Sequence, residues 1–396
     1  MNLAPYLAVL RTPRVPSLML LMLFARIPAT AAGMTITMHV LLTLDRGYGA
    51  AGLVGAMATV GIAVGAPLMG RLTDRRGLRT MLLVSMVSEG LFWFVAPALP
   101  YAVLLVTCFV FGIFVMPVMQ IGRQVVTALV GESGRRTALA MDSMAVEVAF
   151  MAGPALGVLL TTQWSSRVAM WSIGACMVVF GLVLYAVDPP VRDEGERGAT
   201  VPRSRWLTGR LVGVLISAGG ATFVLSGVEV AVVASMRGLG LTDWTGALIV
   251  VMCVASLVGG FVYGGLHRVP PVWALMGAMG LLAVPIGLFG ASPWVLAAAL
   301  VPMNLLCAPT IAGTGEAITQ LTPGSARGEA MGLQGSAFTL GAAVGAPLAG
   351  FVIDHSSPAW GYFVAGVGAV VIAAGSLVLG SAVGGADRAA AVVVER

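Results

Sequence analysis

Long apolar segments of about twenty residues alternate along the chain with short polar or Pro/Gly-rich loops. Each segment is long enough to cross a hydrocarbon layer of about 30 Å as a helix. Alternation with a period of two is absent, and an open sheet cannot span a bilayer, so we expect helices rather than strands. The twelve expected helices lie at about residues 16–43, 49–70, 79–98, 101–126, 138–162, 166–187, 210–234, 243–264, 272–291, 293–319, 329–353 and 359–380.

Composition points to a membrane protein. Hydrophobic residues make up 58% of the chain and charged residues 10%, whereas soluble domains carry about 25% charged residues. A soluble fold could not bury this much apolar surface, so the lipid bilayer is the first expected partner. The net charge of +5 comes from arginine, because the sequence contains no lysine. The arginines lie mostly in short loops, which argues against a nucleic-acid-binding surface.

The arginines also predict the orientation of the chain. If both termini are cytoplasmic, most loop arginines are cytoplasmic, and the other side keeps only Arg46, Arg167 and Arg237. Cytoplasmic loops carry an excess of basic residues. We therefore expect a multi-pass protein of the plasma or inner membrane with both termini in the cytoplasm.

A Pro-rich, charged stretch separates the sixth helix from the seventh. It predicts an N-terminal six-helix bundle at residues 1–187, a cytoplasmic linker at 188–209 and a C-terminal six-helix bundle at 210–396. We interpret the linker as a solvated connection, with a regulatory docking site as the alternative. The last residues, after about 381, are expected to form a short, frayed cytoplasmic tail. The expected fold class is an all-α membrane protein with twelve transmembrane helices in two pseudo-symmetric bundles.

A Gly/Pro signature recurs on helices 2, 5 and 11, and more weakly on helix 8. These are the middle helices of four successive three-helix units, which is the repeat plan of one transporter architecture. Glycine lets helices approach closely and proline lets them bend, so we expect hinge or seal positions, with plain tight packing as the alternative. The residues concerned are Gly65, Pro67, Gly153, Pro154, Gly157, Gly345 and Pro347.

The loop between helices 2 and 3 reads GRLTDRRGLR over residues 70–79. It resembles the most specific signature of the major facilitator superfamily, G-x-L-x-D-R-x-G-x-R, and the resemblance covers essentially the whole chain. That resemblance implies a central cavity lined by helices 1, 4, 7 and 10. It also implies a gating role for Gly70, Asp74, Arg75, Gly77 and Arg79. Asp74 is expected to meet the N-terminus of helix 11 near residues 329–332, and Arg75 and Arg79 are expected to tie the same surface together.

Helix 5 is similar to the Gly-Pro-x-x-Gly signature of twelve-helix drug:proton antiporters. The chain departs from that pattern in helix 4, where the antiporters carry an arginine and this chain has Cys108–Gly112. The proton-coupling role of that arginine is therefore not carried over. The second-half equivalent of the helix 2–3 loop, residues 264–268, keeps only a remnant of the signature.

Ionisable residues inside the spans are the strongest functional candidates, because burying a charge in a membrane is costly. A rise of about 1.5 Å per residue places Arg26, Glu89 and Glu147 roughly 13–15 Å from the cytoplasmic helix ends. We expect Arg26 and Glu147 to pair, with Glu147 binding the coupling proton; a static ion pair is the alternative. Glu89 is a further proton-coupling candidate, with helix packing as its alternative role.

Four other ionisable residues are candidates for the cavity or its gate: Arg123, Asp142, Glu229 and Glu316. Arg123 and Asp142 form a second expected pair, either as a gate latch or as an anchor for a substrate anion. Glu229 and Glu316 are candidate contacts of a cationic substrate. An apolar lining suited to a lipophilic solute is predicted from Met116, Met119, Phe223 and Met303, with plain packing as the alternative.

The functional prediction is a transporter rather than an enzyme. A Walker A motif requires lysine, so ATP is not the expected direct energy source. The four cysteines are scattered and the three histidines are ungrouped, so no metal site, disulfide or cofactor is predicted. We expect a monomeric secondary transporter that exports a small lipophilic or amphiphilic compound in exchange for protons by alternating access. The alternatives are a transporter of a polar metabolite, such as a sugar or organic acid, and a non-transporting sensor or scaffold.

Overall fold

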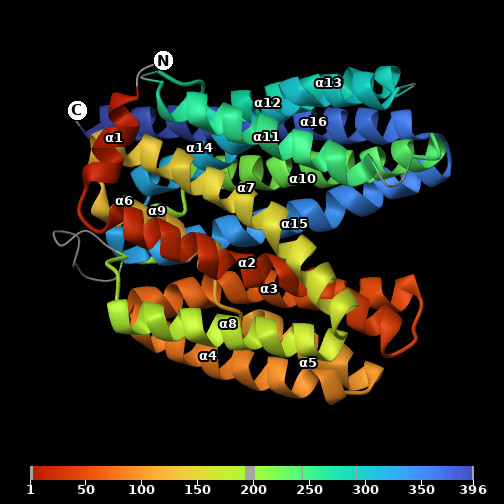
Figure 1. The fold of residues 1–396 in the computed structure, drawn as a ribbon. Coiled ribbons are helices and arrows are strands. Elements are labelled where there is room, and N and C mark those ends of the chain that lie inside the picture. The colour runs from red at the N-terminus through yellow and green to blue at the C-terminus, as the bar shows by residue number, and fades with distance from the viewer. Residues whose placement is uncertain (1–2, 192–200, 242–243, 267, 291, 395–396) are drawn as a thin grey trace.

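The computed structural model describes residues 3–191, 201–241, 244–266, 268–290 and 292–394. Within these ranges the regular structure is helical, without strands, and 12 segments are long and apolar enough to cross a membrane. They coincide with the expected helices to within a few residues at most ends. The expected fold class is therefore confirmed, and the chain is a multi-pass membrane protein built from two six-helix bundles (Figure 1).

A short helix, α1 (Ala4–Arg11), precedes the first bundle. The spans of this bundle are α2 (Val15–Leu42), α3 (Tyr48–Arg76), α4 (Leu78–Val95) with a 3-10 turn at Ala96–Ala98, α5 (Tyr101–Phe114) continued by α6 (Val118–Leu129), α7 (Glu132–Gln163) and α8 (Ser166–Val187).

A four-residue helix, α9 (Arg203–Trp206), lies in the linker. The spans of the second bundle are α10 (Gly209–Gly238), α11 (Thr245–Gly264), α12 (Val272–Ala283) with a 3-10 segment at Val284–Phe289, α13 (Pro293–Asn304) continued by α14 (Cys307–Leu321), α15 (Arg327–Asp354) after a 3-10 turn at Gly324–Ala326, and α16 (Pro358–Val394). α16 thus continues as a helix where a frayed tail was expected.

Both chain ends lie at the same end of the helix bundle, together with α1 and α9, at the left of Figure 1. We call this end the terminal face and the other the opposite face. α3 of the first half and α15 of the second meet near the terminal face and diverge towards the opposite face (Figure 1). The two halves therefore form a V that is closed at the terminal face.

Two spans are interrupted in their middle. The break between α5 and α6 contains Pro117, which has no N–H, and the freed N–H of Met116 donates to Oε1 of Glu89 on α4 at 2.8 Å. Between α13 and α14, the N–H of Ala308 donates to Oγ of Ser256 on α11 at 3.1 Å. In both spans a neighbouring helix supplies the acceptor that the break requires.

The linker is not solvated throughout. Trp206 of α9 is 2% exposed and packs into a cluster with Leu211, Ile318 and Met331 of the second half. The charged part of the expected linker, around residues 192–197, lies outside the described residues. The described part of the linker is therefore anchored at Trp206, while the other residues of α9 are exposed.

Candidate functional site

A cavity of about 610 Å³ lies between the two halves. Its walls come from α2, α3 and α5–α8 of the first half and from α10, α14 and α15 of the second. Most of the lining side chains are apolar or small, and Met116 and Met119 are among them, as expected. Phe223 and Met303 are buried inside the second half instead. The cavity therefore suits a ligand with an apolar body.

Arg123 on α6 is the one charged residue among the described residues that line the cavity. Its side chain is 4% exposed, and its Nη1 donates to Oε1 of Gln334 on α15 at 3.1 Å. Gln334 donates in turn to Thr314 on α14 at 2.6 Å, and the ring centroid of Phe338 lies 5.2 Å from the guanidinium carbon of Arg123. A cation from the first half is thus held by the second half at the edge of the cavity.

Arg26 and Asp142 form a buried ion pair beside Arg123. Nη2 of Arg26 lies 2.6 Å from Oδ1 of Asp142, and Gly122 leaves room for this guanidinium, since a Cβ there would overlap it. Oδ2 of Asp142 lies 3.9 Å from Nε of Arg123, and neither of these atoms has a hydrogen-bond partner among the described residues. The structure thus brings the second expected pair together, and two buried arginines share one carboxylate.

The expected pairing of Arg26 with Glu147 is wrong. Asp142, five residues earlier on α7, faces Arg26 instead, because five residues turn a helix by about 140° and point the two carboxyl groups to different neighbours. Glu147 accepts hydrogen bonds from Ser256 Oγ at 2.7 Å and from Cys307 Sγ at 3.5 Å. Glu147 therefore faces α11 and α14 of the second half.

Two further carboxyl candidates, Glu229 and Glu89, lie in different surroundings. Glu229 on α10 is exposed, and its charge interacts with that of Glu147 across the two halves. Glu89 is fully buried at the break before α6 and is not part of the cavity lining. Roles of Arg26, Glu89 and Glu147 in proton coupling stay predictions.

On the terminal face, α3 and α15 cross in close contact, which we call the first seam. A Cβ at Gly70 would overlap the carbonyl group of Gly328. Asp74 accepts the N–H groups of Gly328 at 3.1 Å and of Glu329 at 2.7 Å, where a helix N-terminus favours a carboxylate. The expected contact of Asp74 is confirmed. Gly77 adopts a φ of 86°, which lets the chain turn from α3 into α4.

Arg71 is the residue of the loop that joins the two halves through charge. Its guanidinium donates to both carboxylate oxygens of Glu329, at 3.1 and 2.9 Å. Arg203 of α9 reaches the same carboxylate at 2.5 Å. The linker helix and α3 thus hold one side chain of α15 between them.

The expected contacts of Arg75 and Arg79 with this surface are wrong. Arg79 follows the turn at Gly77, so it lies on α4 and pairs with Asp188 at 3.2 Å within the first half. Arg75 is exposed and has no ion pair among the described residues. The expected gating roles of Arg75 and Arg79 therefore lack a contact with α15 in this structure.

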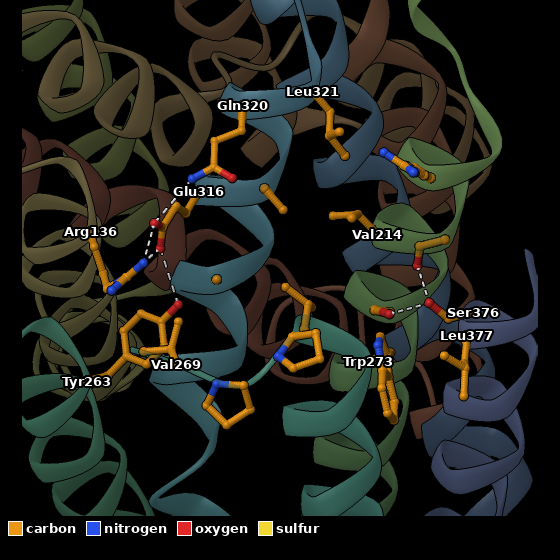
Figure 2. Close-up of a pocket in the computed structure, with 18 residues that line it drawn as sticks. Arg136, Val214, Tyr263, Val269, Trp273, Glu316, Gln320, Leu321, Ser376 and Leu377 are labelled. Atoms are coloured by element: carbon orange, nitrogen blue, oxygen red, sulfur yellow. Dashed lines mark hydrogen bonds and ion pairs between the residues drawn. The ribbon is translucent and has the colours of Figure 1, made fainter. Parts of the chain in front are cut away.

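A second seam joins α7 of the first half to α11 and α14 of the second. Arg136 donates from two nitrogens to both oxygens of Glu316, each at 2.9 Å, and the hydroxyl of Tyr263 lies 3.4 Å from the same carboxylate (Figure 2). Thr137 donates to the carbonyl oxygen of Gly264 at 2.5 Å. Glu316, a candidate contact of a cationic substrate, is therefore occupied by a cation of the protein itself.

The N-terminal helix lies across the second seam. The ring of Tyr6 on α1 stacks on Phe261 of α11 with centroids 4.7 Å apart, and its hydroxyl donates to the carbonyl oxygen of Phe261. Burial raises the pKa of Tyr6 to about 12, so the hydroxyl stays a donor at neutral pH.

Comparison with known protein families identifies the architecture. A family model described as the Major Facilitator Superfamily matches residues 18–269 and 214–389, which together cover most of the chain. The chain belongs to this superfamily. No curated protein sequence matches it.

Solved structures of superfamily transporters share the fold. A bacterial homologue of the iron transporter ferroportin, in an outward-facing state, aligns with a TM-score of 0.72 at 15% identity over 92% of this chain and 98% of that one. The human organic anion transporter MFSD10 (TETRAN) gives 0.69 at 15% identity over 92% and 99%. The proton:xylose symporter XylE gives 0.68 at 15% identity over 90% and 94%. At these identities the likeness concerns the fold alone.

The repeated glycines of this superfamily member are packing positions in the structure. Gly65 of α3 packs on the backbone of Ile113, and Gly259 of α11 packs in the same way on Leu305. In the other repeat, Gly153 and Gly157 of α7 pack on α2, and Gly345 of α15 packs on α10. Proline stands inside the helix at Pro67, Pro154 and Pro347. Close packing of the repeats is therefore observed, and a hinge role stays a prediction.

Sequence reasoning missed four residues of this arrangement: Arg71, Arg136, Arg203 and Gln334. Gln334 carried a usable signal, since it is a polar side chain in an otherwise apolar helix, and such residues face other helices rather than lipid. Arg71 and Arg136 lie in loops between expected helices, and position in a sequence does not say which acidic side chain a long arginine reaches.

Proposed function

We propose that this superfamily member is a secondary transporter that exports a small amphiphilic compound carrying one negative charge. The observation that carries the proposal is the charge beside the cavity: Arg26 and Arg123 share one carboxylate, and Arg123 borders an otherwise uncharged, largely apolar space. A buried excess cation attracts an anionic group, while the apolar walls favour a hydrophobic body.

The proposed topology places the terminal face in the cytoplasm, in line with its arginine-rich loops. The cavity would then be open to the outside, and both seams would be the closed cytoplasmic gate. Export needs these seams to part and the V to close at the opposite face. The expected location remains the plasma or inner membrane, with a monomer as the working unit.

Proton coupling is proposed for Glu147 and Glu229. Their charges interact across the halves, and Glu147 accepts hydrogen bonds from a hydroxyl and a thiol rather than from a cation in the described part of the chain. Two neighbouring carboxyl groups without a cation between them favour the binding of one proton, because two like charges repel each other. Separating the halves changes this repulsion. An anion leaving and a proton entering are both driven by an inside-negative potential, by about 2.3 kcal/mol per charge at 100 mV.

The anion claim is tested by flux in proteoliposomes, using an aromatic carboxylate and its neutral amide as paired probes. We expect a pH gradient to drive the carboxylate, and Arg123→Gln to lower its rate about tenfold or more, because a charge-assisted contact is lost. Arg237→Gln, an exposed arginine near the opposite face, is the matched control. Equal rates for carboxylate and amide would refute the preference for an anion.

The coupling claim is tested by Glu147→Gln. We expect this variant to keep exchange of carboxylate across the membrane but to lose acceleration by a pH gradient, since a neutral amide cannot take up the proton. Glu132→Gln, an exposed residue at the start of α7, is the control. A variant that remains fully driven by the gradient would remove Glu147 from the mechanism.

A polar organic acid is the second candidate substrate. Thr30, Thr37, Thr59, Gln120 and Thr339 add hydrogen-bonding groups to the cavity lining, beside the same arginine. A series of carboxylates with growing apolar bodies distinguishes the two cases. Rates that rise with apolar size favour the amphiphile, and rates that rise with hydroxyl groups favour the polar acid.

A further inference from the structure

We propose that the protein carries a second binding site, on its terminal face, for an amphiphilic anion that holds this face closed. The site is a pocket of about 480 Å³ between the ends of α10, α12, α14 and α16, next to the second seam (Figure 2). It is separate from the central cavity and shares no lining residue with it among the described residues.

The acceptors on the seam side of the pocket are already used. Both oxygens of Glu316 accept from Arg136, and Tyr263 and Gln320 approach the same carboxylate at 3.4 Å. Figure 2 shows these four side chains together on one side of the pocket. A cationic ligand would find this carboxylate occupied, which argues against a cation in the pocket.

Two donors elsewhere in the pocket, on Arg210 and Trp273, have no partner in the described part of the chain. Arg210 is exposed and makes no ion pair or side-chain hydrogen bond within the described part of the chain, and the indole N–H of Trp273 has no partner there either. With Arg136 and Arg210 against Glu316, the lining carries one excess positive charge. A carboxylate, sulfonate or phosphate group is the complementary ligand chemistry.

The remaining wall is apolar and partly aromatic. Trp273 and Leu377 are about two-fifths exposed, at 37% and 41%, and Pro270 and Pro271 complete this side of the pocket. Ser217 and Ser376 bond to each other at 2.8 Å, so they add little free polarity. A flat apolar body can lie against this wall while its anionic group meets Arg210, which defines an amphiphilic, preferably aromatic, anion.

The pocket depends on the state of the two halves. Arg136 is the one described lining residue that comes from the first half, and it is held there by Glu316 of the second. When the halves separate at the terminal face, Arg136 moves away from the pocket. A ligand that touches it binds the closed state more tightly, and it therefore shifts the protein towards that state. The binding itself does not depend on the proposed transport; only its inhibitory consequence does.

Equilibrium dialysis of 2-naphthalenesulfonate against the full-length protein in phosphatidylcholine nanodiscs tests the site. We expect binding of the probe to this pocket to persist in Arg123→Gln, which alters only the central cavity. In Arg210→Gln its affinity for the pocket should fall about tenfold, because one charge-assisted contact is lost. Trp273→Ala should also weaken it, and Arg237→Gln should not. Unchanged binding in Arg210→Gln, measured in the Arg123→Gln background, would overturn the proposal.

Dependence on the closed state is tested from the other seam. Gly70→Val does not touch the pocket. By forcing α3 away from α15, it should nevertheless lower the affinity of the pocket for the probe. Full affinity in this variant, together with a spectroscopically open terminal face, would contradict state-selective binding. If phosphatidylglycerol in the nanodisc displaces the probe in the wild type but not in Arg210→Gln, the occupant is a lipid headgroup and the soluble-ligand proposal is wrong.

Discussion

The two seams close the same face of the molecule by different physical means. At the first seam, glycines let α3 and α15 touch backbone to backbone, and Asp74 binds the N–H groups of a helix end. At the second, the halves meet through long side chains, Arg136 and Glu316, with a pocket beside them. The first seam is therefore sensitive to added volume, and the second is sensitive to charge and to ligands.

Each seam also has a strap from outside the twelve spans. The linker helix α9 covers the first seam, with Trp206 buried and Arg203 bound to Glu329. The N-terminal helix α1 covers the second, through Tyr6 on Phe261. The strap α1 belongs to the first half and binds the second, so it must release when the face opens and adds to the free energy of opening. The described contacts of α9 are with the second half, so α9 supports the α15 side of the first seam.

The largest effect is expected from added volume at the first seam. Gly70→Val places a side chain where the carbonyl of Gly328 now lies, and overpacking of this kind costs about 1–3 kcal/mol or more. We expect most molecules to lose the closed terminal face. Spin labels at the exposed positions Arg75 and Arg268 should then report longer distances between the two halves.

Gly375→Val is the matched control for this change, because a Cβ at Gly375 meets nothing within 4 Å. It should leave the label distances unchanged. If the distance between the spin labels is unchanged in Gly70→Val as well, the first seam accommodates the added side chain while it stays closed. That result would contradict a rigid contact between α3 and α15.

At the second seam, the expected effect comes from charge. Glu316→Gln removes both charge-assisted hydrogen bonds of Arg136, whose side chain is 25% exposed and can be partly solvated. We expect a cost of about 1.5 kcal/mol to the closed state, or about a tenfold change in the open-to-closed ratio. The same spin-label pair measures it, with Glu132→Gln as the control.

A smaller effect is expected from Asp74→Asn. The amide oxygen can still accept an N–H group of α15, but the charge at the helix N-terminus is lost, at about 0.5–1 kcal/mol. Since Asp74 and Glu316 lie in different seams, the effects of the two variants should add to within about 0.5 kcal/mol. Marked non-additivity would mean that the two sites are energetically coupled through the structure between them. Asp354→Asn, an exposed residue at the end of α15, is the control.

The smallest effect is expected from Tyr6→Phe, which keeps the stacked ring and removes one hydrogen bond, worth about 0.5 kcal/mol. Because the pKa of Tyr6 is raised to about 12, the hydroxyl keeps its proton well below that pH. The effect on opening should therefore be flat between pH 6 and 9. Tyr101→Phe removes a comparable bond to Ala50 at the opposite face and serves as the control.

The spans and the family could be predicted because both depend on local signals. Apolar length decides the helices, and the residues of the loop at 70–79 are placed by backbone needs: Gly70 by close approach, Gly77 by its positive φ, and Asp74 by a helix end. These requirements are visible in residue type alone.

Partner choice among charged residues could not be predicted in the same way. Depth along the helices matched Arg26 with Glu147 and placed Asp142 nearer the surface, because α7 was expected to begin at 138 and begins at Glu132. Rotation around the axis also decides which carboxyl group faces Arg26, and a shift of one residue turns a side chain by about 100°. The contacts of Arg71 and Arg136 depend on how the two halves are docked, which no local pattern encodes.

The carboxyl group of Glu89 has a consequence for how the chain enters the membrane. Glu89 on α4 would be costly to insert alone, and so would a span whose backbone is broken at Pro117. The hydrogen bond from Met116 gives Oε1 of Glu89 a donor and gives the N–H at the break an acceptor. We therefore expect α4 and the α5–α6 span to enter the bilayer together as a hairpin, with Glu89 serving the assembly of the protein before it serves the folded state.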